Sequence, residues 1–175
     1  TSAEQMKDLG IRRLSDVARF DAAIGDGYNA EGYYDFLSVR GFVIDNRFNY
    51  RRDGLPINAE TSVPLDNKQR IEILKGPQPT HFGKNAIAGA FGVVTRKPQP
   101  EFEASLDAYY EFEHEETAIT GVVNVPVSDT LAARVAARWR DLDGYMTNTA
   151  GGQRSPQQRD ELARLALRWT PLDEL

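Results

Sequence analysis

The segment 70–98, RIEILKGPQPTHFGKNAIAGAFGVVTRKP, constrains the fold more than any other part of the chain. It begins as a short apolar strand that ends at a Gly-Pro pair, and it ends as a second strand over 91–95. Between them, Gly76, Gly83 and Gly89 indicate tight turns or close backbone packing, where a Cβ would be in the way. The segment therefore predicts two strands joined by a tightly folded connection.

Two other interpretations of this segment are less well supported. Gly76, Gly83 and Lys84 superficially resemble the phosphate-binding pattern G-x-x-x-x-G-K-[ST]. Here six residues rather than four separate the glycines, and Asn85 stands where the Mg²⁺-binding hydroxyl should be. The second interpretation is a glycine-rich connection in an unrelated α/β domain, and the downstream half of the chain argues against it.

The composition excludes several classes of protein. A net charge of −5 without a basic stripe argues against nucleic-acid binding. The absence of cysteine excludes disulfides and thiolate metal sites. No apolar run reaches about eighteen residues, so no transmembrane helix is expected, although barrel strands would escape this test. No signal peptide is recognisable, and Thr1 is expected to lie inside a longer protein.

The first half of the chain mixes helix and strand signals. Ser2 is placed to cap one short helix, and Ser15 or Asp16 to cap a second. Asp53-Gly54 is typical of a hairpin turn. These signals predict a small α/β domain that ends near residue 98. Its expected elements are helices over 3–9 and 14–20, strands over 35–42, 48–52, 55–57, 71–74 and 91–95, and one helical turn over 64–69.

After residue 98 the sequence changes to period-two alternation. Over 102–112 the even positions carry Phe, Ala, Leu, Ala, Tyr and Phe, and the odd positions are mostly polar or charged. The same alternation recurs over 119–127, 131–139 and 163–169. It predicts four strands, each with one apolar and one polar face. Such strands suit either a sheet over a core or a barrel wall between lipid and water.

Strand length and loop asymmetry favour the barrel over a soluble sandwich. Strands of about nine to eleven residues match a tilted crossing of the hydrocarbon layer. The connection 128–130 is tight and 143–158 is long and polar, as periplasmic turns and extracellular loops are. Aromatic residues gather at both expected rims, as in membrane-interface belts. They are Tyr110, Phe112, Trp139 and Tyr145 at one rim, and Phe102 and Trp169 at the other.

Three motifs in this order resemble the plug domain of TonB-dependent outer-membrane receptors. They are VRGF at 39–42, with Gly41 at a turn, RRDGLP at 51–56, with Gly54 at a turn, and the segment 70–98. The resemblance implies an α/β plug domain, a small mixed sheet with short helices, over residues 1–98. It also implies that residues 99–175 form the first four antiparallel strands of a transmembrane β-barrel. Because four strands cannot close a barrel, the chain is expected to be a fragment of a plugged barrel of about 22 strands.

The resemblance also implies a function and its partners. The whole protein is expected to import a ferric siderophore across the Gram-negative outer membrane, energised by the TonB complex with ExbB and ExbD. The partners are then the ferric siderophore, the TonB complex and outer-membrane lipid, and iron enters only as part of the transported chelate, without a resident cofactor. The alternatives are a TonB-dependent receptor for haem, cobalamin or a glycan, and a soluble α/β binding module with a β-sandwich. No enzyme is predicted, because no nucleophile–base pair or carboxylate dyad stands out.

Arg40, Arg70 and Glu72 are the candidate latch between plug and barrel. In the family, the arginines of the R-G-F and R-I-E strands face the barrel wall and pair with carboxylates of later strands. Those partners are expected beyond Leu175. Removing one partner of a buried pair costs roughly 3–5 kcal/mol, which suits a latch that holds and is then released.

The candidate ligand-binding side chains lie in plug loops that are expected to point outward. Aromatic rings with an arginine and amides suit an iron chelate, which presents flat apolar faces and anionic oxygens. The acidic run 111–116, which contains His114, is expected to be a solvated turn rather than a metal site. The ligand-binding candidates are Tyr28, Tyr33, Tyr34, Asn46, Arg47, Phe48 and Tyr50.

Overall fold

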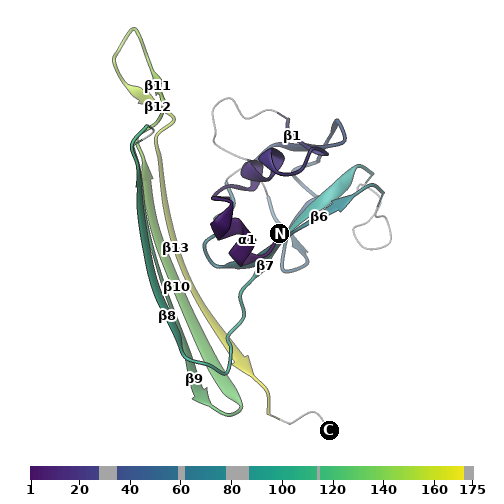
Figure 1. Ribbon diagram of the computed structural model, residues 1–175, viewed down its shortest axis with the longest axis vertical. Coiled ribbons are helices and arrows are strands. Elements are labelled where there is room, and N and C mark those ends of the chain that lie inside the picture. The colour runs from purple at the N-terminus through teal and green to yellow at the C-terminus, as the bar shows by residue number, and fades with distance from the viewer. Residues whose placement is uncertain (28–34, 59–61, 78–86, 114, 172–175) are drawn as a thin grey trace. The chain divides into compact units, whose positions relative to one another are not determined.

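The computed structural model describes residues 1–27, 35–58, 62–77, 87–113 and 115–171. Its chain divides into two compact units, Thr1–Arg96 and Lys97–Leu175 (Figure 1). The division falls two residues before the expected one after residue 98. Among the described residues, no helix is both long and apolar enough to cross a membrane.

The first unit is a small α/β domain with a mixed sheet, as predicted. Four strands lie in the order β5-β4-β7-β6, with β4 parallel to β7 and the other neighbours antiparallel. A second, antiparallel sheet has the order β1-β2-β3. Buried side chains of both sheets and of the helical segments form one core, which includes Leu14, Leu37 and Ile71. The elements are α1 (Ala3–Asp8), η1 (Leu14–Arg19), β1 (Ile24–Asp26), β2 (Leu37–Val39), β3 (Phe42–Val43), β4 (Tyr50–Arg52), β5 (Leu55–Pro56), β6 (Lys68–Lys75) and β7 (Gly89–Thr95).

The caps of the two short helices differ in how well the sequence predicts them. Ser2 caps α1 as predicted, since its hydroxyl accepts from Gln5 N (3.2 Å) and the Gln5 side chain accepts from Ser2 N (2.9 Å). The second helix is a 3₁₀ helix whose N-cap is Arg13, so the prediction of Ser15 or Asp16 as its cap was wrong. The Asp16 carboxylate instead reaches back to accept from Arg13 N at 2.8 Å.

Two hairpins turn through pairs of residues with positive φ. Asp53 (φ 53°) and Gly54 (φ 84°) make the predicted turn between β4 and β5. Arg40 (φ 51°) and Gly41 (φ 83°) make a second such turn, between β2 and β3. The prediction of one continuous strand over 35–42 was therefore wrong. The sequence does not reveal this turn, because arginine is an unusual residue in the left-handed region. The prediction of a helical turn over 64–69 was also wrong, because only residues 66–67 form a turn and β6 begins at Lys68.

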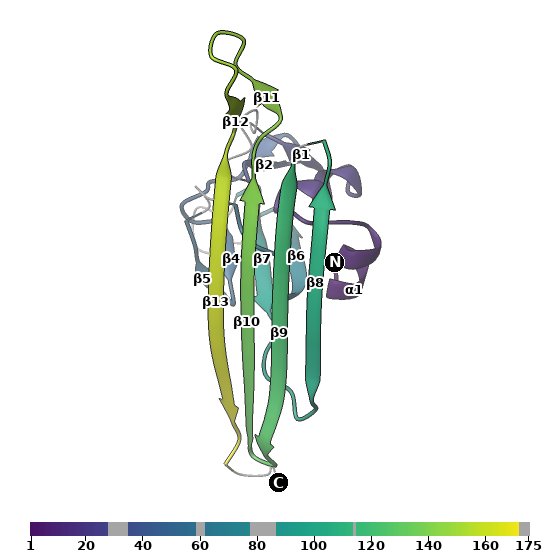
Figure 2. The ribbon, with the colours of Figure 1, turned by 90° about the vertical axis from the view of Figure 1, so that its left-hand side faces the viewer.

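The second unit is a four-stranded antiparallel sheet in the order β13-β10-β9-β8 (Figure 2). Its strands are β8 (Glu103–Glu111), β9 (Glu116–Ser128), β10 (Leu131–Leu142) and β13 (Gln158–Trp169). The tight connection between β9 and β10 is as predicted. The connection between β10 and β13, expected to be a plain loop, carries a two-stranded ribbon of β11 (Met146–Thr147) and β12 (Arg154–Ser155).

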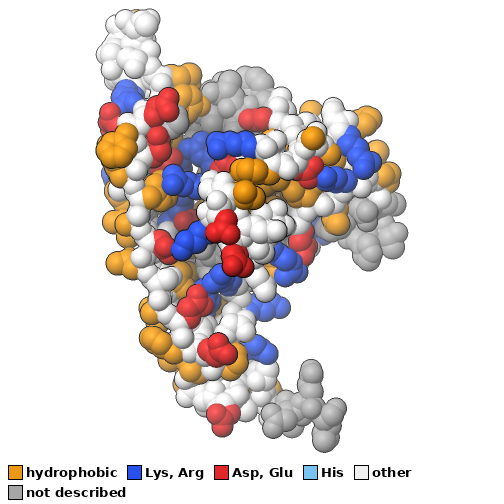
Figure 3. Space-filling model, viewed as in Figure 1, with side chains coloured by type: hydrophobic (Ala, Val, Ile, Leu, Met, Phe, Trp, Pro, Cys, Tyr) orange, Lys and Arg blue, Asp and Glu red, His pale blue; other side chains and the backbone are white. Residues whose placement is uncertain are grey.

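The register of this sheet places the predicted apolar positions on the same face, apart from Val127 at a register shift and Phe102 and Phe112 outside β8. Leu106 pairs with Gly121, Gly121 with Ala137, and Ala137 with Ala163, so the four strands are aligned across the sheet. Figure 3 shows hydrophobic side chains along one face of the sheet. We call this the apolar face: Ala104, Leu106, Ala108, Tyr110, Ile119, Gly121, Val123, Val125, Leu131, Ala133, Val135, Ala137, Trp139, Ala163, Leu165, Leu167 and Trp169.

Candidate functional site

The apolar face of the second unit is uncovered within the unit. Leu106 is 78% exposed, Leu165 67% and Leu167 66%, values unlike those of a protein core. Along β10 the face extends from the level of residue 131 to that of residue 141, ten steps or ~33 Å. A strand tilt of 35–45° reduces this length to a height of ~23–27 Å, close to the ~25 Å apolar band of outer-membrane barrels.

Aromatic residues mark the two ends of this face, as the sequence predicts. Tyr110 is level with Thr117 at one end, and Trp139 lies one row inward, opposite Ile119. Trp169 lies opposite Leu131 at the other end. Rings at both ends of an apolar band are typical of a bilayer interface, where their polar atoms reach water.

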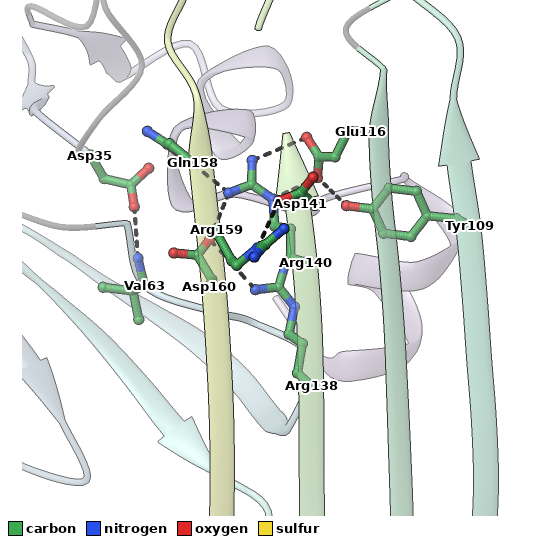
Figure 4. Close-up of polar contacts among 10 residues, drawn as sticks. All are labelled: Asp35, Val63, Tyr109, Glu116, Arg138, Arg140, Asp141, Gln158, Arg159 and Asp160. Atoms are coloured by element: carbon green, nitrogen blue, oxygen red, sulfur yellow. Dashed lines mark hydrogen bonds and ion pairs between the residues drawn. The ribbon is translucent and has the colours of Figure 1, made fainter. Parts of the chain in front are cut away.

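The opposite face of the sheet is charged and is held by an ion-pair network (Figure 4). The Arg140 guanidinium contacts both Glu116 carboxylate oxygens, with Nε–Oε1 at 2.8 Å and Nη2–Oε2 at 3.1 Å. It also donates to Asp160 (2.7 Å) and Gln158 (3.1 Å), and the Tyr109 hydroxyl donates to Glu116. The network thus joins all four strands at one end of the sheet.

A second ion pair crosses the charged face toward the other end of the sheet. Arg134 of β10 donates to the Glu103 carboxylate of β8 at 2.8 Å. The intervening strand presents Asn124 between them, since Asn124 is the register partner of both. Cross-strand pairs of this kind stabilise the register of the sheet.

The acidic run at 111–116 is not a simple solvated turn. Glu116 belongs to β9 and is buried in the Arg140 network, so that prediction was wrong for this residue. Glu115 pairs with Arg154 of β12, which also donates to the Glu113 carbonyl (3.2 Å). Arg154 thereby connects the β8–β9 turn to the β11–β12 ribbon. His114 lies outside the described residues.

The candidate latch residues lie in two different sheets of the first unit, Arg40 at the turn between β2 and β3, and Arg70 and Glu72 on β6. Arg70 donates to Glu72 at 2.7 Å, and both side chains are nearly half exposed. Arg40 is exposed at its hairpin turn, and its backbone N–H donates to Ala23 O (2.7 Å). Arg70 therefore has a partner two residues away, and its role as a latch stays a prediction.

Arg47 is exposed and held in one orientation by its neighbours. Its guanidinium donates twice to the Asp45 carboxylate, from Nε (3.1 Å) and from Nη2 (2.9 Å). It also lies 5.3 Å from the centroid of the Phe48 ring, which is 43% exposed. The hydrogen bond from Arg47 holds the pKa of Asp45 below its ordinary value. Arg47 and Phe48, with the neighbouring Asn46, thus form a preorganised surface that presents a cation beside an aromatic ring.

Tyr50 does not belong to that surface. It is 1% exposed, its ring stacks on Phe91 at 5.6 Å, and its hydroxyl accepts from Leu37 N (3.0 Å). Burial raises the pKa of its phenol. Tyr50 is a core residue, so its prediction as a ligand contact is corrected. Tyr28, Tyr33 and Tyr34 lie outside the described residues.

The glycine predictions can be compared with the backbone. At Gly89, the first residue of β7 (φ 150°), an added Cβ would lie 2.2 Å from Leu74 O of β6, so no residue with a Cβ fits at this position. Gly41, Gly54 and Gly76 have positive φ, as turn positions require. Gly83 lies outside the described residues. No group of three His, Asp or Glu side chains able to hold a metal ion occurs in the described part of the chain.

Sequence reasoning missed two buried polar groups that join separate segments. Asp35 is 1% exposed and accepts from Ser15 N (3.2 Å) and Val63 N (3.3 Å), as Figure 4 shows for Val63. Burial raises the pKa of this carboxyl. Asn124 is fully buried and bonds to the chain that precedes β8. Both are single polar residues next to apolar ones, a pattern too common to identify them in the sequence.

Comparison with known proteins gives matches to both units. A family model described as the TonB-dependent receptor plug domain matches residues 1–90. The ferrienterobactin receptor of Escherichia coli K12 is 32% identical over 145 residues, which cover 66% of this chain and 19% of that receptor. The catecholate siderophore receptor Fiu of the same organism is 24% identical over 166 residues, 90% of this chain and 20% of Fiu.

The solved structures show the same fold. The ferric yersiniabactin uptake receptor FyuA of Yersinia pestis superposes with a TM-score of 0.83 at 23% identity. The superposition covers 98% of this chain and 28% of FyuA. This chain therefore spans about a fifth of the length of the curated receptors that it matches.

Proposed function

We propose that the whole protein imports a ferric siderophore across the outer membrane, because this chain belongs to the family of TonB-dependent receptors with a plug domain. Residues 1–98 are then the plug and residues 99–175 the first four strands of the barrel wall. Transport is energised through the TonB complex, and iron enters only within the chelate.

One observation carries the membrane part of this proposal. The four aligned strands expose an apolar face with aromatic ends on one side and bury an ion-pair network on the other. In a soluble sandwich the apolar face would be the covered one and the charged face the solvated one. An apolar band of this height with a polar opposite face supports contact with lipid on one side.

The ligand class follows from the relatives together with the surface at Arg47. The relatives are named for several siderophores, including enterobactin, catecholates and yersiniabactin, so their names support the class of siderophores rather than one member. A fixed guanidinium beside the exposed Phe48 ring complements an anionic chelate with flat apolar faces. Asn46, Arg47 and Phe48 are the described residues that we assign to ligand contact.

Arg40, Arg70 and Glu72 remain our candidates for the latch. An exposed Arg70–Glu72 pair contributes little by itself to the first unit, because both groups are solvated. In a closed barrel the same side chains would lose their hydration and would stabilise the plug only if they gained further partners. Their assignment therefore depends on strands beyond this chain.

The proposal is tested by growth of a strain without the full-length gene on a panel of single iron chelates. We expect growth to fail on at least one siderophore and to return with the plasmid-borne gene. Panels with haem, cobalamin or a glycan as the required nutrient form the control arms. A growth defect confined to one of those arms would assign that nutrient, and not a siderophore, as the transported ligand. Unaffected growth in every arm would contradict import altogether.

A further inference from the structure

The link that leads from the first unit into β8 is built so that it cannot pair along both of its edges as a regular strand. Its sequence is Lys97-Pro98-Gln99-Pro100-Glu101. Proline lacks a backbone N–H and fixes φ near −65°, so Pro98 and Pro100 hold the link extended while removing two ladder donors. Gln99, between them, is left with one N–H and one C=O that need partners away from a regular strand.

Asn124 of β9 supplies both partners with a single side chain. Its Oδ1 accepts from Gln99 N at 3.0 Å, and its Nδ2 donates to Gln99 O at 2.9 Å. The same nitrogen donates to Glu101 O at 2.5 Å. Two residues in an antiparallel ladder exchange an N–H and a C=O in the same way, so the Asn124 amide acts as a one-residue strand partner.

The surroundings hold this amide in place. Asn124 is fully buried, and the Glu103–Arg134 ion pair joins the two strands that flank it. The link is further braced by its own side chain, because Gln99 Nε2 donates to Lys97 O (3.2 Å). A buried amide with its acceptor and donor both satisfied is costly to detach, since each group would have to find a new partner.

We propose that Asn124 is a positioning residue that anchors the link to the barrel wall throughout transport, an inference that rests on the proposed function. The C-terminal end of the plug then keeps its place on β9, and any rearrangement that opens a path must occur N-terminal to Lys97. The anchor is a fixed pivot rather than a part that is released.

Hydrogen exchange of the full-length receptor in lipid tests the anchor without any ligand. In the peptide 97–102 only Lys97, Gln99, Glu101 and Phe102 carry an exchangeable backbone N–H, because the other two residues are prolines. We expect Asn124→Ala to speed exchange of this peptide about tenfold or more. Thr120→Ala, the preceding polar position on the same face of β9, is the matched control and should leave it unchanged. Unchanged exchange in Asn124→Ala would overturn the anchor.

A cross-link tests whether the link can stay on β9 during transport. Gln99→Cys with Asn124→Cys can be joined by a short bis-maleimide in a full-length receptor without other accessible thiols. Uptake equal to that of the untreated pair supports a fixed pivot, whereas loss of uptake on cross-linking shows that the link must leave β9 and overturns the proposal. Failure of the unmodified receptor to take up any iron chelate would contradict the proposed function instead, and the exchange result would still decide the anchor.

Discussion

Arg140 is the residue whose loss should most weaken the barrel wall. Its side chain is 4% exposed and that of Glu116 10%, so their pair is shielded from water. Arg140→Ala leaves the Glu116 carboxylate buried without its cation, which costs roughly 3–5 kcal/mol. Asp160 adds little to this cost, because it is 35% exposed and Arg138 lies 4.0 Å away.

Glu116→Ala should cost less stability than Arg140→Ala, and the double variant should cost less than the sum of the two single variants. Glu116→Ala leaves Arg140 bonded to Asp160 at 2.7 Å, so we expect a cost near the lower end, about 3 kcal/mol. In the double variant neither buried charge is left without its partner. The two effects should therefore be non-additive by about 1–3 kcal/mol.

Urea unfolding of the full-length receptor in lipid vesicles measures these free energies. The folded fraction can be read from the faster migration of the unheated protein on a gel. Asp107→Asn, at an exposed position on the same charged face, is the control and should change stability little. Additive single effects, or costs below about 1 kcal/mol for both, would refute the buried network as a structural element of the wall.

Three further predictions concern the first unit. Arg40→Ala or Arg70→Ala should increase leakage of large antibiotics through the receptor more than it lowers ligand affinity, and normal transport without leakage in both would remove the latch. Arg47→Ala should weaken siderophore binding about tenfold or more with assembly intact, because a shielded charge-assisted bond contributes roughly 1.5–3 kcal/mol, and unchanged affinity would sink that assignment. Burial raises the pKa of Asp35 above its ordinary value of 3.8. Above pH 3.8 the folded unit therefore keeps this proton more readily than the unfolded chain does, so the contribution of Asp35 to the stability of the unit falls as the pH rises. Asp35→Asn should flatten this pH dependence in hydrogen exchange of Leu37, and an unchanged slope would show that another group causes it.

The sequence predicts the sheet of the second unit better than any other feature. Alternation identifies which residues share a face because the side-chain period of a strand is two, and the register confirms it from Leu106 across to Ala163. Strand ends are harder to predict. Glu116 lies in an acidic run that is typical of a loop. It nevertheless belongs to β9, where Arg140 of the neighbouring strand compensates its charge.

The plug surface is predicted less well, for a physical reason. Tyr50 and Phe48 have similar sequence surroundings, but one lies in the core and the other on the surface. Only the parallel pairing of β4 with β7 decides this, because it places Tyr50 opposite Phe91. Such non-local pairing leaves no local pattern in a strand of three residues.

Membrane assembly of two neighbouring substitutions tests the central claim, that the apolar face contacts lipid. Leu106 is 78% exposed and paired with Gly121 in the middle of the sheet, whereas Asp107 lies on the charged face opposite Thr120. Leu106→Arg should reduce the folded full-length receptor in the outer membrane, because an arginine near the bilayer midplane costs roughly 2–4 kcal/mol. Asp107→Asn should assemble normally. Equal assembly of both variants would contradict the assignment of this face to lipid.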